Sequence, residues 1–184
     1  MVGCTVPVCK AMIVAMLLIA ALIDWLTYRI PNWLTAGGML FGLVYNTLTV
    51  QPWQDGLLGS VSGLGVGIAV LLPVYLLRVM GAGDVKLMGM VGAIVGLPDI
   101  VLAVLYSLIV GGIAAVAFAL YHKAARRMTA NVMDIVQSMV FAVAVGTRPT
   151  PALAGRASIG KLPYGVSIAG GTIAWLIARL FGLA

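Results

Sequence analysis

The chain has 184 residues, of which 62% are hydrophobic and only 9% are charged. Soluble domains carry about 25% charged residues, so this composition excludes an ordinary soluble protein and predicts that most of the chain lies in lipid. The net charge is +6, but the Lys and Arg residues are scattered among apolar runs and form no basic face for nucleic acid. We therefore expect the positive charge to lie in loops that face anionic membrane lipid.

Six apolar runs are candidates for membrane-spanning helices, each of which needs about 20 apolar residues. In chain order they cover about residues 12–28, 34–50, 57–79, 85–97, 100–121 and 162–180. Breaks at Pro31-Asn32, at residues 51–56 and at Pro98-Asp99 separate them, and Pro73 is expected to kink the third. The pattern predicts an all-α, polytopic membrane protein with six transmembrane helices, in which residues 1–184 form a single integral-membrane domain.

Two segments leave the number of crossings open. Residues 85–97 are too few to cross alone. A helix that starts at Met80 would place Asp84 about one turn inside the membrane, and a re-entrant segment is the alternative. Residues 131–145 carry one apolar face and fit either a seventh span or a helix that lies in the interface.

The distribution of Lys and Arg favours six crossings, because cytoplasmic loops are enriched in both. With six spans and the N-terminus outside, nine of the eleven fall inside, and only Lys10 and Arg179 lie outside. With seven spans the division becomes seven against four.

The N-terminal segment is apolar. Residues 11–23 are apolar like a signal peptide, but no small-residue cleavage site follows, so we interpret them as the first helix.

Residue types that bind metals are few in this chain. The chain has two cysteines, Cys4 and Cys9, and one histidine, His122. These are too few for a zinc site, and no metal or other cofactor is expected. Cys4 and Cys9 can form a disulfide in an oxidising compartment, and two ordinary thiols are the alternative.

The chain contains five Asp and no Glu. Asp55, Asp99 and Asp134 lie in predicted loops, where we expect solvated surface groups. Asp24 lies in the last turn of the first span, and Asp84 lies at the start of the fourth. A charged group there costs several kcal/mol unless it is paired or hydrated, so each is a candidate functional residue.

The alternative role for Asp24 and Asp84 is a structural ion pair, with Arg29, Arg78 or Lys86 as the partner. However, two crossings separate the two Asp residues, so both lie at the same membrane face. Two carboxylates held close together share one proton, which is the aspartic-protease arrangement. A Ser-His-Asp or Cys-His site would depend on His122 alone. Gly81 and Gly83, which lack Cβ atoms, would permit unusual backbone angles and close approach of an extended peptide beside Asp84.

Three segments together resemble the prepilin peptidases, a family of GxGD aspartic proteases. Asp24 is followed by a short basic stretch and Ile30-Pro31-Asn32. Gly81-Ala82-Gly83-Asp84-Val85-Lys86 resembles the second signature, and Pro163-Tyr164-Gly165 before the last span resembles the third. The three occur in the family's order and at matching places relative to the spans.

This resemblance implies a membrane aspartic endopeptidase that removes the cytoplasmic leader from type IV prepilins and pseudopilins of pilus and secretion systems. The family pattern makes Asp24 and Asp84 the catalytic pair. Its motifs assign shaping of the substrate site to Gly81, Gly83, Lys86, Pro31, Asn32, Pro163, Tyr164 and Gly165. The implied partners are a prepilin with a basic leader and an apolar helix, and membrane lipid. Homo-oligomerisation stays open, and the implied location is the inner (cytoplasmic) membrane, with the site near its cytoplasmic face.

The chain departs from the long bacterial members of that family, which carry a cytoplasmic domain with two Cys-x-x-Cys pairs between the first two spans and also methylate the new N-terminus. Here only residues 29–33 fill that gap. The chain resembles the short form found with Flp-type tight-adherence pili, and methyltransferase activity is not expected. Archaeal preflagellin peptidases are short as well, so the resemblance leaves the source open.

Two other classes of protein would also place acidic residues in the membrane. A small transporter or proton channel uses such residues together with Gly-broken helices, although the chain shows no internal repeat. A scaffold subunit of a pilus or secretion system would keep Asp24 and Asp84 in salt bridges. Replacement of each Asp by Asn distinguishes these classes from a protease.

Overall fold

The computed structural model describes residues 7–76, 80–121, 137 and 163–182. Within them we find helices and no strand, which confirms the all-α prediction. The helices are α1 (Pro7–Thr27), α2 (Asn32–Thr49), α3 (Trp53–Leu76), α4 (Ala82–Val95), α5 (Asp99–Tyr121) and α7 (Tyr164–Leu180). Apart from Gln137, the predicted interfacial segment 131–145 lies outside the described residues.

The chain divides into two compact units. The first contains Met1–Gly111 and Pro163–Ala184, and the second contains Gly112–Leu162, so α5 runs from one into the other. All contacts described below lie within the first unit.

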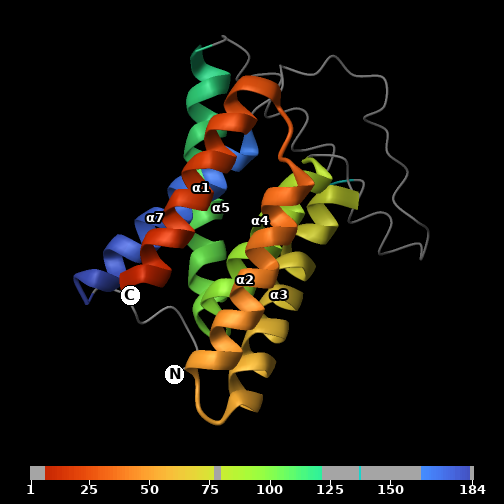
Figure 1. Cartoon of the computed structure of the whole chain (residues 1–184). Coiled ribbons are helices and arrows are strands. Elements are labelled where there is room, and N and C mark those ends of the chain that lie inside the picture. Colours follow the sequence, from red (N-terminus) through yellow and green to blue (C-terminus); the bar gives the residue numbers. More distant parts are fainter. Residues whose placement is uncertain (1–6, 77–79, 122–136, 138–162, 183–184) are drawn as a thin grey trace. The chain divides into compact units, whose positions relative to one another are not determined.

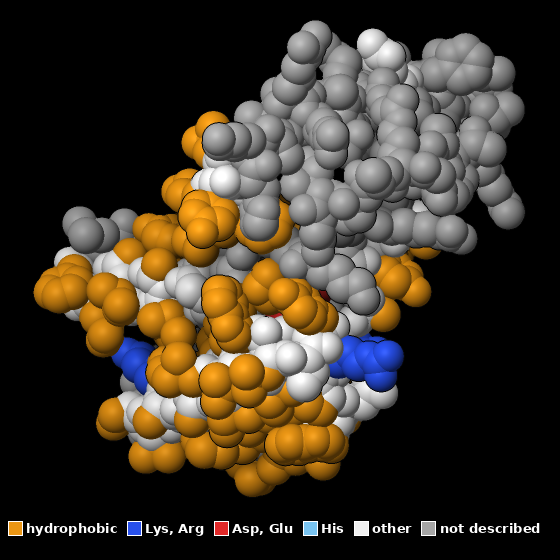
Figure 2. All heavy atoms as spheres, turned by 90° about the horizontal axis from the view of Figure 1, so that it is seen from above, with side chains coloured by type: hydrophobic (Ala, Val, Ile, Leu, Met, Phe, Trp, Pro, Cys, Tyr) orange, Lys and Arg blue, Asp and Glu red, His pale blue; other side chains and the backbone are white. Residues whose placement is uncertain are grey.

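In the described part, three helices are long and apolar enough to cross a membrane: α1, α3 and residues 99–118 of α5. Helix α7 is a shorter apolar helix. Large hydrophobic side chains such as Leu22, Leu40, Leu58 and Leu105 are exposed on these and neighbouring helices, and Figure 2 shows hydrophobic atoms over much of the described surface. Exposed apolar surface on this scale fits a lipid environment, so the chain is a polytopic membrane protein, as predicted.

Two helices begin earlier than the apolar runs indicated. Helix α1 starts at Pro7 and α3 at Trp53, although we expected residues 51–56 to form a break. Proline is favourable at the first helical position because its missing N–H would be unpaired there anyway. In α3, Asp55 lies in the first turn, where the helix dipole favours a negative charge. The helix continues through Pro73 to Leu76.

Helix α4 is enclosed by other helices. It has 14 residues, which span only about 21 Å, and every residue from Leu87 to Val95 is buried. It packs against α2 and α3, which form an antiparallel pair (Figure 1), and also against α1 and α7. A Cβ on Gly63 would collide with the carbonyl oxygen of Gly92, so glycine permits the close α3–α4 contact. Because α4 is surrounded by protein, its short length is compatible with its position.

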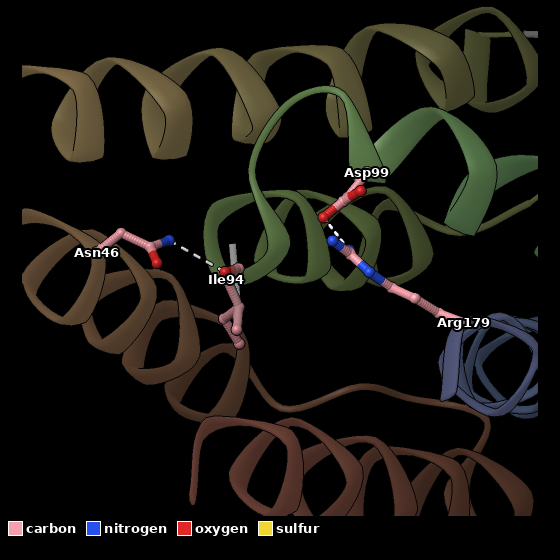
Figure 3. Close-up of polar contacts among 4 residues, drawn as sticks. All are labelled: Asn46, Ile94, Asp99 and Arg179. Carbon is pink, nitrogen blue, oxygen red and sulfur yellow. Dashed lines mark hydrogen bonds and ion pairs between the residues drawn. The ribbon is translucent and has the colours of Figure 1, made fainter. Parts of the chain in front are cut away.

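The C-terminal end of α4 receives a polar side chain from α2. The Nδ2 of Asn46, which is fully buried, donates to the carbonyl oxygens of Ala93 (3.2 Å) and Ile94 (3.0 Å), as Figure 3 shows for Ile94. The last carbonyls of a helix have no partner within the helix, and an unpaired one is costly inside a membrane. Asn46 also donates to Ser60 Oγ (2.8 Å) in α3, so one side chain connects three helices.

Asp99 differs from the prediction of a solvated surface group. Its carboxylate forms an ion pair with Arg179 of α7 (Figure 3), and its side chain is only 14% exposed. The Arg179 guanidinium also lies 5.5 Å from the centroid of the Trp175 ring, a cation–π distance. Asp55 is exposed, as predicted, and Asp134 lies outside the described residues.

The N-terminal cysteine pair is only partly described. Cys9 is fully buried in α1 and is disulfide-bonded. Cys4, the other cysteine of the chain, lies outside the described residues.

Candidate active site

Four helix ends meet at the site: the C-terminus of α1 and the N-termini of α2, α4 and α7. Asp24 of α1 is bonded to α7, and Asn32 of α2 is bonded to α4. Ile30, in the connection between α1 and α2, lies against both α4 and α7. The three motif segments, which are far apart in the sequence, therefore come together.

Asp24 is buried at the start of α7. Its side chain is 5% exposed, and Oδ2 accepts a hydrogen bond of 2.8 Å from the backbone N–H of Gly165. The first N–H groups of a helix have no partner within it, so Asp24 caps α7, which has Pro163 as its own N-cap residue. A Cβ on Gly165 would lie 2.8 Å from Asp24 Oδ2. The glycine therefore permits the carboxylate to reach the backbone.

Asp84 caps the helix to which it belongs, α4. It lies in the first turn, is 7% exposed, and its Oδ2 accepts a hydrogen bond of 3.0 Å from the N–H of Gly81. Gly81 has φ −82° and ψ 156°, an extended conformation that any residue adopts, and Gly83 is already helical. Neither glycine therefore uses the unusual backbone angles that it would permit, and the close approach of an extended peptide stays a prediction. Gly83 is explained by close approach, because its Cβ would lie 3.2 Å from the Cβ of Ile30.

The two buried carboxyl groups lie in one site, because Ile30 lies against Gly83, the residue before Asp84, and against Gly165, whose N–H binds Asp24. Among the described residues, neither Asp forms an ion pair. Arg29 is exposed, and Arg78 lies outside the described residues. The alternative of a structural salt bridge thus finds no support from Arg29 or Lys86.

Lys86 and Asn32 bind each other beside the pair. Lys86 Nζ donates to Asn32 Oδ1 over 2.9 Å, and both side chains are exposed. Pro31 is the N-cap residue of α2. This bond links the first motif to the second on the exposed side of the site.

No role was predicted for two residues of the α1–α2 connection, Tyr28 and Ile30, although Ile30 belongs to the Ile30-Pro31-Asn32 segment of the first motif. Tyr28 has a positive φ of 52°, and its N–H donates to the carbonyl of Asp24 over 2.8 Å. This left-handed residue ends α1 and reverses the chain, which brings Ile30 against Gly83 and Gly165. The sequence gives little indication of a left-handed turn at Tyr28, because Tyr rarely adopts this conformation and no glycine is present there.

The described residues contain no cluster of His, Cys, Asp or Glu that could hold a metal ion, and His122 lies outside them. What the site does offer is two buried carboxyl groups on separate helices, each bonded to a backbone N–H at a helix N-terminus. Such a pair can exchange protons with a water molecule and a bound carbonyl group.

Comparison with known protein families agrees with the motifs. Residues 11–116 match the model of the type IV leader peptidase family. The chain belongs to this family. The matched part contains Asp24, Asp84 and Lys86, whereas Tyr164 and Gly165 lie beyond it. Neither a search of curated proteins nor a search of solved structures found a match.

Proposed function

We propose that this leader peptidase is an aspartic endopeptidase that uses Asp24 and Asp84 to activate water and removes the leader of Flp-type prepilins and pseudopilins. The observation that carries the proposal is that two buried carboxyl groups, Asp24 of α1 and Asp84 of α4, lie where the ends of these helices and of α7 meet around Ile30. Burying acidic side chains without a cation is unfavourable. A catalytic role explains why two such groups lie in one site of a peptidase.

The pair works with one carboxyl protonated and the other ionised. The ionised carboxylate takes a proton from water while the water oxygen attacks the scissile carbonyl carbon. The protonated carboxyl gives its proton to the carbonyl oxygen, and a tetrahedral diol forms. The C–N bond then breaks as a carboxyl returns a proton to the leaving nitrogen and a diol hydroxyl gives up its proton. The products are the leader's new C-terminus and the mature N-terminus.

The surroundings of the pair support an action at a membrane boundary. Trp25 and Trp33 are exposed on either side of the α1–α2 connection, and Trp is enriched where membranes meet water. Exposed Arg29 and Lys86 lie at the same end, which supports an inner-membrane protein with its site at the cytoplasmic face. A substrate with a basic leader and an apolar helix would place its cleavage site at this depth.

The short α1–α2 connection supports proteolysis without methylation. Helix α1 ends at Thr27 and α2 begins at Asn32, so only residues 28–31 join them. We therefore propose that the enzyme leaves an unmethylated N-terminus.

Incubation of the purified protein with Flp-type prepilins in liposomes tests this function. Mass spectrometry should show loss of the leader, typically after a glycine, and a free amine on the mature pilin even when a methyl donor is present. Failure to cleave any of several prepilins would contradict the proposal and favour a transporter or scaffold role.

A further inference from the structure

Ile30 touches the surroundings of both candidate catalytic residues. A Cβ on Gly83, the residue before Asp84, would lie 3.2 Å from Ile30 Cβ and 3.6 Å from Ile30 Cγ1. A Cβ on Gly165, which donates its N–H to Asp24, would lie 3.0 Å from Ile30 Cδ1. The base of this side chain therefore packs on α4 and its tip packs on α7.

We infer that Ile30 is a positioning residue, a spacer between the N-termini of α4 and α7 that sets the separation of the Asp24 and Asp84 carboxyl groups. The glycines on both sides bring the backbones close enough for one side chain to fill the gap. Closely packed interiors respond to the loss of even one methylene group. The inference rests on the proposed function, because the separation matters only if the two groups act as a pair.

Ile30 is held in place from both directions along the chain. The left-handed Tyr28 precedes it, and Pro31 caps α2 immediately after it. It is half-buried against the core cluster. Because Ile30 is fixed in this way, the length of its side chain determines the distance between the helix ends that it touches.

The inference is tested by infrared titration of the carboxyl groups, which requires no substrate. The chain has five Asp and no Glu, so few side-chain carboxyl bands overlap, and subtraction of the Asp24→Asn, Asp84→Asn double variant isolates the pair. Among the titratable groups that the structure describes near the pair, Tyr164 also interacts electrostatically with Asp84, while Lys86 is bonded to Asn32 and Arg29 is exposed. All three remain in every variant.

Ile30→Val removes the δ-carbon that reaches Gly165 and keeps the contact with Gly83, whereas Ile30→Leu keeps a δ-carbon. We expect Val to displace the titration midpoints of the pair by about half a pH unit or more, and Leu to stay closer to wild type. Ile13→Val, in the fully buried core of α1 about 16 Å along the helix from Asp24, is the matched control and should match wild type. Coincident titration curves for wild type and Ile30→Val would overturn the inference.

Activity provides the second measurement. In Ile30→Val, kcat for prepilin cleavage should fall about tenfold, with KM within about twofold, because misplaced groups slow chemistry more than binding. Ile30→Leu should recover part of the loss. Equal kcat for wild type and Ile30→Val would also overturn the inference. If wild type itself cleaves no prepilin, the proposed function fails, while the titration still decides whether Ile30 spaces the pair.

Discussion

The Asp24 carboxylate accepts a hydrogen bond of 2.8 Å from the backbone N–H of Gly165, 141 residues further along the chain. This bond joins the first described helix to the last and places a buried carboxyl group at the N-terminus of α7. The bond explains the structural role of the Pro163-Tyr164-Gly165 segment: Pro163 is the N-cap residue of α7, and Gly165 leaves room for the Asp24 carboxylate.

Gly165→Ala should strongly reduce activity. The added Cβ would lie 2.8 Å from Asp24 Oδ2 and 3.0 Å from Ile30 Cδ1, so the carboxylate must move. We expect kcat to fall about a hundredfold, with an overpacking cost of about 1–3 kcal/mol in the free energy of unfolding. Gly65→Ala in α3 is the matched control, because nothing lies within 4 Å of its Cβ. If the Gly165→Ala variant were as active as the Gly65→Ala control, the close contact would be unimportant.

Loss of the Lys86–Asn32 hydrogen bond should lower kcat/KM only slightly, and by the same amount whichever of the two residues is replaced. Both side chains are exposed, and exposed polar pairs contribute little. Lys86→Met and Asn32→Ala should each lower kcat/KM about two- to threefold, and the double variant should be no worse than either, because each change removes the same contact. Kinetics on the four proteins of this cycle measures the coupling. Multiplicative losses would mean that the two residues act separately.

Asn46→Ala should destabilise the protein far from the site. It leaves the carbonyls of Ala93 and Ile94 without the partners that Asn46 Nδ2 provides, and we expect about 1–3 kcal/mol lower free energy of unfolding. Denaturant unfolding in mixed micelles measures this change. Ser60→Ala removes the bond from Asn46 and the long 3.4 Å bond that Ser60 Oγ donates to the Gly42 carbonyl. It should cost less, because the α4 carbonyls keep Asn46 as their partner. Equal stability of wild type and Asn46→Ala would refute the capping role.

The sequence predicted the helices well because membrane insertion constrains them strongly. Apolar runs of sufficient length identify lipid-embedded helices, and the number of crossings between Asp24 and Asp84 predicts a common face. Helix starts at Pro7 and Trp53 were missed because they lie outside the apolar runs, where capping and helix-dipole effects decide the boundary.

The contacts between helices could not be predicted in the same way. Hydrophobicity indicates which residues lie in lipid, but not which helices are neighbours. The ion pair of Asp99 with Arg179 and the bonds of Asn46 to α4 depend on that packing. The role of Ile30 depends on it too, because the Ile30-Pro31-Asn32 motif marks the residue but does not indicate which helices its side chain contacts.

The most direct test of the central claim is prepilin cleavage by Asp24→Asn and Asp84→Asn, with Asp55→Asn as the matched control. Asn preserves size and removes the ionisable group, and Asp55 is an exposed Asp in the first turn of α3. We predict that each of the first two variants folds and loses activity about a thousandfold or more, while Asp55→Asn cleaves like wild type. Substantial cleavage by either Asp24→Asn or Asp84→Asn would contradict the catalytic pair.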